Sequence, residues 1–112
     1  MKFYSLNHTA PEVTFDQAVI NGIGPDKGLY FPEKISPLPP NFFENIEGLP
    51  NTEIAFTAIN QFVAGVLPDN VLRDILKEVL DFDFPLVTLT ENVATLELFH
   101  GPSAAFKDFG AS

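Results

Sequence analysis

Two segments in the middle of the chain repeat their apolar residues at the three- to four-residue spacing of an α-helix. The first follows Asn51, a residue type that can cap a helix, and closes near Gly65. The second follows the break at Leu67–Asn70. The apolar positions are Ile54, Ala58, Ile59, Phe62 and Val66 in the first segment, and Val71, Leu72, Ile75, Leu76, Val79 and Leu80 in the second. Because the connection is so short, the pattern predicts two helices packed as a hairpin or an L.

The first third of the chain predicts a short strand, a helix and a tight turn, in that order. Lys2–Leu6 is rich in aromatic residues and reads as a strand, and Thr14 with Gln17 forms the capping box of a helix. Turn-forming residues then fill Gly22–Gly28, ahead of a brief strand at Leu29–Pro32. The glycines do not match a dinucleotide loop, because their spacing is wrong and they follow a helix where a strand is required.

The last section of the chain changes to strand-forming residues. Leu86–Thr90 and Val93–Phe99 are rich in aliphatic and β-branched side chains, and Glu91 and Asn92 separate them as a tight turn. We therefore predict the α+β class: a small N-terminal domain of helices with a short sheet over residues 1–84, followed by the first strands of a second domain over residues 85–112.

Composition narrows the classes of function. The chain has 112 residues, 46% of them hydrophobic and 12 of them phenylalanine, so it can form a modest core. Six Lys and Arg residues and a net charge of -9 leave no basic patch for nucleic acid or an anionic membrane. Cysteine is absent, and no apolar run is long enough for a signal peptide or a membrane span, so we expect a cytoplasmic protein.

Lys107 is the strongest candidate for chemistry, because it stands among small and aromatic residues. Gly101 and Lys107 have the separation of a nucleotide phosphate loop. That interpretation fails because Phe106 replaces the glycine before the lysine, and Asp108 replaces the Ser or Thr that would bind magnesium.

A Schiff-base lysine is the second interpretation of this segment. A free lysine has a pKa of about 10.4, and burial among Phe99, Phe106 and Phe109 would lower it and make the amine nucleophilic. The alternative is a lysine with a buried stem and an amine in water. The residue pattern by itself leaves both open and favours the second.

The whole motif Phe99–Gly110 resembles the pyridoxal-phosphate lysine motif of threonine synthase. Tyr4–Ser5 and Gly24–Pro32 are similar to the N-terminal domain of the same family, in the same order. The chain departs from the family at three places: Ser103 stands where threonine is usual, Lys27 stands where glycine is usual, and Leu6–His8 replaces a run of the Thr-Arg-Gly type.

The resemblance implies a fold-type II, tryptophan-synthase-like domain that binds pyridoxal phosphate and converts O-phosphohomoserine and water to threonine and phosphate. It implies that Lys107 holds the cofactor and acts as the base. Phe106 and Asp108 would adjoin the cofactor, Ser103 would contact the substrate, and no metal is expected. His100 is a weaker candidate for a proton relay.

The residues of the chain hold no phosphate-binding loop, so we expect an N-terminal fragment of a longer enzyme. Alone, this fragment should be inactive and should not bind pyridoxal phosphate stoichiometrically. Its partner in the complete site would be the remainder of its own chain. Residues after Phe99 should then be poorly packed or held by another molecule. Two other functions stay open: a non-catalytic protein-interaction domain, and another fold-type II lyase or dehydratase.

Overall fold

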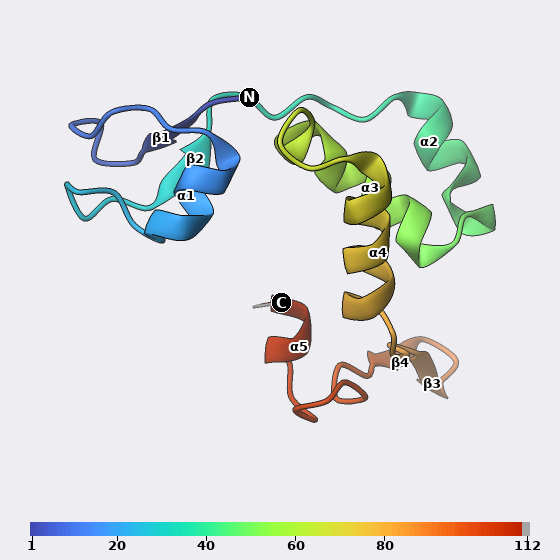
Figure 1. The fold of residues 1–112 in the computed structure, drawn as a ribbon. Helices are drawn as coiled ribbons and strands as arrows, with labels where there is room; N and C mark the ends of the chain where they lie inside the picture. Colours follow the sequence, from blue (N-terminus) through green and yellow to red (C-terminus); the bar gives the residue numbers. More distant parts are fainter. Residues whose placement is uncertain (111–112) are drawn as a thin grey trace. The chain divides into compact units, whose positions relative to one another are not determined.

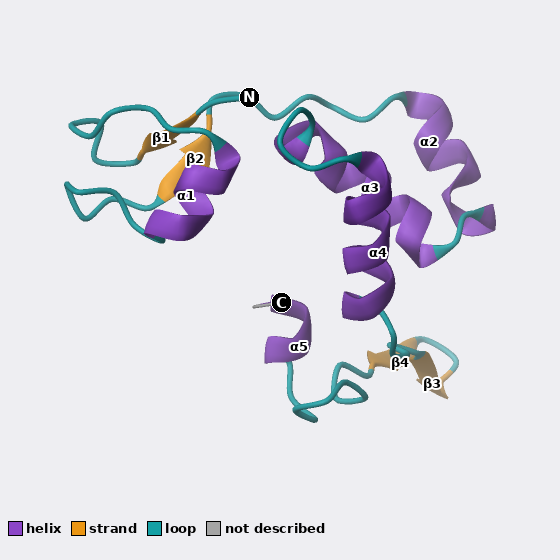
Figure 2. Cartoon of the chain, viewed as in Figure 1, coloured by secondary structure: helices purple, strands orange, loops and turns teal. Residues whose placement is uncertain are grey.

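The computed structural model describes residues 1–110, and the chain divides into two compact units, Met1–Asp74 and Ile75–Ser112 (Figure 1). The helices are α1 Phe15–Asn21, α2 Pro40–Asn45, the 3₁₀ turn η1 Ile46–Gly48, α3 Asn51–Val63, α4 Asp69–Val79 and α5 Lys107–Gly110; the strands are β1 Phe3–Ser5, β2 Tyr30–Pro32, β3 Leu86–Thr90 and β4 Val93–Leu96. Figure 2 shows helices and strands mixed along the chain, which confirms the predicted α+β class.

The first unit begins with a two-stranded antiparallel sheet next to a capped helix. β1 pairs with β2 through Phe3 opposite Pro32 and Ser5 opposite Tyr30. The predicted capping box is present at the start of α1, where the Thr14 N–H donates to the Gln17 side-chain oxygen at 3.2 Å. The Phe15 ring then lies 5.8 Å from the buried ring of Phe3, so the cap places an aromatic side chain of α1 against β1.

The Asp26 carboxylate joins the turn after α1 to the end of β1. It accepts hydrogen bonds from the fully buried Ser5 hydroxyl at 2.6 Å, from the Thr9 N–H and hydroxyl at 3.1 and 3.0 Å, and from the Gly28 N–H at 3.1 Å. The Ser5 hydrogen bond is the main reason why the pKa of Asp26 lies well below its usual value. We call Ser5, Thr9, Asp26 and Gly28 the Asp26 cluster.

The backbone of this turn leaves little freedom for substitution. A Cβ atom on Gly28 would lie 2.0 Å from the Ser5 Oγ and 2.9 Å from the Asn7 nitrogen. The Gly24 N–H donates to the Gly28 carbonyl at 2.8 Å, which closes the tight turn predicted from the sequence. Lys27 has a left-handed φ of 64°, which explains why a glycine is favourable at this position.

Helices α3 and α4 meet through Arg73. Its guanidinium lies 3.9 Å above the centre of the Phe56 ring and is also hydrogen bonded to the Glu53 carboxylate. The contact confirms that the two predicted helices pack together. One detail of the prediction was wrong: Asn51 is the first helical residue, and Pro50 takes the capping position because its carbonyl already accepts the N–H groups of Glu53 and Ile54 at 2.9 and 3.1 Å.

The second unit contains the predicted hairpin of β3 and β4. Leu86 pairs with Leu96 and Thr90 with Val93, with an irregularity between Thr88 and Thr90. β4 ends at Leu96, earlier than the Phe99 expected from the sequence. The reason is Pro85: its carbonyl accepts the Glu97 N–H at 3.0 Å, but proline has no N–H to donate in return, so the ladder stops.

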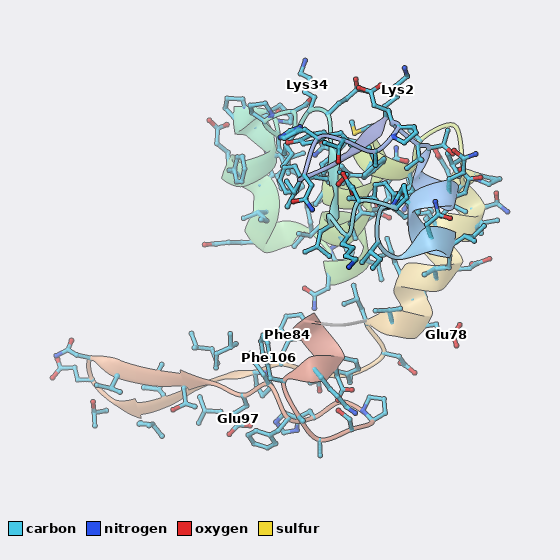
Figure 3. All side chains as sticks on the ribbon, turned by 90° about the vertical axis from the view of Figure 1, so that its left-hand side faces the viewer. Lys2, Lys34, Glu78, Phe84, Glu97 and Phe106 are labelled. Carbon is cyan, nitrogen blue, oxygen red and sulfur yellow. The ribbon has the colours of Figure 1, made fainter. Side chains whose placement is uncertain are left out.

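The apolar side chains of this hairpin are largely exposed. Leu86 is 69% exposed and Leu96 is 53% exposed. Figure 3 shows side chains on both faces of the hairpin. A two-stranded ribbon by itself is only marginally stable in water.

Candidate active site

The candidate site is the segment that leads from β4 into the short helix α5. The Ala104 N–H donates to the Gly101 carbonyl at 2.9 Å, and Ala104 has a left-handed φ of 52°. This turn brings the chain around to Lys107, the first residue of α5. The sequence-predicted residues Ser103, Lys107 and Asp108 therefore lie on one turn and the helix that follows it.

The Asp108 carboxylate points back to the turn. Its Oδ2 atom accepts the Ser103 N–H at 3.0 Å. A Cβ atom on Gly101 would lie 2.5 Å from this Oδ2 and 2.8 Å from the Asp108 Cβ, so a side chain at position 101 would displace the carboxylate. We call Gly101, Ser103 and Asp108 the Asp108 cluster.

The Ser103 hydroxyl is buried and has no hydrogen-bond partner among the described residues. A buried hydroxyl without a hydrogen-bond partner lowers the stability of the fold by on the order of 1 to 3 kcal/mol. Such unpaired groups are therefore rare in natural proteins. The carboxylate of Asp108 bonds the Ser103 backbone and not this hydroxyl. The hydroxyl is thus available for a polar group from outside the described part of the chain.

Lys107 is exposed, and the aromatic residues around it do not enclose it. Phe99 is 53% exposed. Phe106, labelled in Figure 3, is 64% exposed, as expected from the prediction that residues after Phe99 are poorly packed. The side chain of Phe109 lies outside the described residues. The apolar burial proposed for Lys107 is therefore not supplied by Phe99 or Phe106, because these rings themselves face solvent.

A pocket of about 320 Å³ adjoins the turn within the second unit. Its lining is Glu78, Val79, Asp81, Phe82, Pro102 and Asp108. Three of these six side chains are carboxylates, which repel an anion. The pocket therefore does not fit the phosphate of pyridoxal phosphate.

His100 has a partner of its own. Its Nε2 atom lies 2.7 Å from the Glu97 carboxylate, and its ring stacks on Phe99 with 4.5 Å between ring centres. These contacts hold the histidine between strand and turn and favour a structural role over the proton relay. Sequence reasoning missed the Glu97 contact, although its three-residue spacing from His100 is a visible signal.

Residues 1–110 offer neither a metal site nor a membrane span. No group of His, Asp or Glu side chains in this part of the chain has an arrangement that could hold a metal ion. Each helix of the described chain is too short or too polar to cross a membrane.

Known proteins resemble this chain along its full length. The sequence profile described as "Threonine synthase N terminus" matches residues 2–80. Threonine synthase of Haemophilus influenzae is 42% identical over 110 residues, which cover 98% of this chain and 25% of that protein. Threonine synthase of Pseudomonas aeruginosa is 38% identical over 114 residues, covering 97% and 24%. The chain thus spans about a quarter of the length of these relatives.

Solved structures agree with the sequence comparison. The crystal structure of threonine synthase from Escherichia coli matches with a TM-score of 0.88 at 32% identity, over 98% of this chain and 26% of that one. A PLP-bound threonine synthase from Brucella melitensis matches equally well, with a TM-score of 0.88 at 32% identity over 96% and 24%. The match to both the profile and these relatives shows that the chain belongs to the threonine synthase family.

Proposed function

We propose that this chain is the N-terminal part of a pyridoxal-phosphate-dependent threonine synthase, in which Lys107 holds the cofactor. The enzyme would break the bond between the γ-carbon and the phosphate oxygen of O-phosphohomoserine, and water would add at the β-carbon to give threonine and phosphate. The observation that carries the proposal is the exposed Lys107 on the same turn and helix as an unpaired, buried Ser103 hydroxyl.

When bound, the cofactor supplies an electron sink for the carbon atoms of the substrate. Lys107 would hold the cofactor through its amine, and the same amine would take and return protons at the substrate carbons. The Ser103 hydroxyl donates a hydrogen bond to the substrate, which satisfies the atom left unpaired in the described chain. Phe106 lies beside Lys107 in the chain and would flank the cofactor. The resemblance implies the same place for Asp108, but the Asp108 carboxylate accepts the Ser103 N–H on the turn instead.

The rest of the site belongs to further residues of the same protein. The described pocket is lined by carboxylates and cannot hold the phosphate group, so a separate loop must do so. In this proposal residues 85–112 begin the fold-type II catalytic domain, residues 1–84 form the N-terminal domain, and the whole enzyme works in the cytoplasm. The exposed hairpin and Phe106 would pack against the remainder of the chain.

The test is an assay of the full-length protein that carries this chain. It should release phosphate and form threonine from O-phosphohomoserine, and Lys107→Ala should abolish both, while Lys77→Ala, which changes a lysine on α4, should leave them unchanged. Threonine synthesis that survives Lys107→Ala would contradict the proposal. Deamination of serine or threonine without a reaction of O-phosphohomoserine would instead favour a lyase or dehydratase of the same fold type.

The chain of 112 residues alone gives a second test. We expect it to lose added pyridoxal phosphate on dialysis, because no described group cradles the phosphate. A visible absorbance band of lysine-bound cofactor that survives dialysis, and disappears in Lys107→Ala, would show that the chain alone completes a site.

A further inference from the structure

We propose that Asp108 is a positioning residue for the substrate-binding serine and does not itself touch the cofactor. Its carboxylate would hold the turn at Gly101–Ala104 against α5 and so fix the place of the Ser103 hydroxyl. This inference rests on the proposed function, because it assumes that Ser103 meets the substrate.

The direction of the Asp108 side chain is the first support. Its Oδ2 accepts the Ser103 N–H at 3.0 Å, five residues upstream, so the carboxylate faces the turn. Neighbouring residues on a helix point about 100° apart, which separates this carboxylate from the exposed Lys107 that would hold the cofactor. Asp108 thus faces the turn, and Lys107, one residue earlier in the chain, faces outward.

The lack of space at Gly101 is the second and independent support. A Cβ there would lie 2.5 Å from Oδ2 and 2.8 Å from Cγ of Asp108. Gly101 therefore limits the Oδ2 side of the carboxylate, and the Ser103 N–H binds that same oxygen.

The third support is that Asp108 binds the backbone N–H of Ser103 and not its hydroxyl. The buried hydroxyl stays unpaired among the described residues. A charged acceptor makes a stronger hydrogen bond to an N–H than a neutral one does. The arrangement therefore fixes the backbone of Ser103 firmly while it keeps the hydroxyl for a ligand.

The experiment compares Asp108→Ala and Asp108→Asn in the full-length protein with Asp83→Ala, which removes the same charge from an exposed position in the same unit. Three quantities are measured: the hydrogen exchange rate of the Ser103 amide, the Kd for pyridoxal phosphate added to cofactor-free protein, and KM and kcat for O-phosphohomoserine. Gly101→Ala serves as a second way to displace the carboxylate if Asp108→Ala folds poorly.

If Asp108 is a positioning residue, Asp108→Ala should raise the hydrogen exchange rate of the Ser103 amide about tenfold. It should also raise KM for O-phosphohomoserine about tenfold, because one charge-assisted hydrogen bond is lost. The Kd for pyridoxal phosphate should stay within about twofold, because the cofactor loses no contact. Asp108→Asn keeps an oxygen acceptor and should show smaller changes, Gly101→Ala should resemble Asp108→Ala, and Asp83→Ala should match the wild type.

The proposal is overturned if Asp108→Ala and Asp108→Asn both weaken cofactor binding about tenfold while the Ser103 amide exchanges as in the wild type. Failure of the proposed function looks different, since the wild-type protein itself would then neither bind pyridoxal phosphate nor react with O-phosphohomoserine. In that case the hydrogen exchange rate of the Ser103 amide tests the positioning contact by itself. Faster exchange in Asp108→Ala supports the contact, and unchanged exchange overturns it.

Discussion

The two units of the chain each contain an aspartate that holds a turn beside a glycine with no room for a side chain. In the first unit Asp26 accepts four hydrogen bonds, and a Cβ on Gly28 would lie 2.0 Å from the Ser5 Oγ. In the second unit Asp108 accepts the Ser103 N–H, and a Cβ on Gly101 would lie 2.5 Å from its Oδ2. The same local device thus serves both units.

The two serines are where the clusters differ. The buried Ser5 hydroxyl donates to its aspartate, whereas the buried Ser103 hydroxyl is unpaired among the described residues. A cluster that satisfies its own polar atoms stabilises the fold, whereas an unpaired buried atom calls for an explanation. We therefore propose a structural role for the Asp26 cluster and, as part of the proposed function, a substrate-binding role for the Asp108 cluster.

Gly28→Ala should have the largest effect on stability. The added Cβ collides with the Ser5 Oγ and approaches the Asn7 backbone to 2.9 Å, and such overpacking costs about 1 to 3 kcal/mol of unfolding free energy. Urea unfolding of the purified protein measures this cost. Gly48→Ala is the matched control, because a Cβ there meets nothing within 4 Å. Equal stability of the two variants would mean that the Asp26 cluster is not closely packed.

Exchanging each serine for alanine separates the two roles directly. Ser5→Ala removes a buried hydrogen bond and should lower the free energy of unfolding by about 1 to 2 kcal/mol. Ser103→Ala removes a buried hydroxyl without a partner in the described chain, so the free energy of unfolding should stay the same or rise, by up to about 1 to 3 kcal/mol, while KM for O-phosphohomoserine rises. A Ser103→Ala variant that is clearly destabilised and keeps its KM would reverse the assignment.

The smallest effect should be on the acid sensitivity of the first unit. The pKa of Asp26 is lowered in the folded protein, chiefly by the Ser5 hydrogen bond. Its stabilising contribution is therefore complete above the unfolded value of about 3.9 and is lost as the pH falls below it. Asp26→Asn should lower Tm at pH 7 and reduce the further loss of Tm on acidification, whereas Asp83→Asn should do neither. A wild-type Tm that falls between pH 8 and pH 6, with the fall absent in Asp26→Asn, would contradict the expectation that Asp26 stabilises the fold throughout this pH range.

The elements of the fold follow from local signals in the sequence. The capping box of Thr14 and Gln17 lies where α1 begins, and the strand-forming run Leu86–Thr90 has the bounds of β3. The end of β4 was missed because it depends on the missing N–H of Pro85, on the opposite strand, and not on the residues of β4.

The candidate site was less predictable than the fold. Lys107 stands out in the sequence because of its apolar neighbours, but their exposure depends on which other residues cover them. The contact of Asp108 with Gly101 and Ser103 needs the left-handed turn at Ala104, which no residue pattern indicates, because alanine rarely adopts that conformation. The sequence therefore indicated candidate residues for the site but not their contacts.

The central claim is that Lys107 carries the cofactor, and its most direct test is chemical labelling. The full-length protein is loaded with pyridoxal phosphate, reduced with borohydride to make the lysine bond permanent, digested and mapped by mass spectrometry. We expect one labelled residue, Lys107, and no label in Lys107→Ala. A label on another lysine, or none on the wild-type protein, would contradict it.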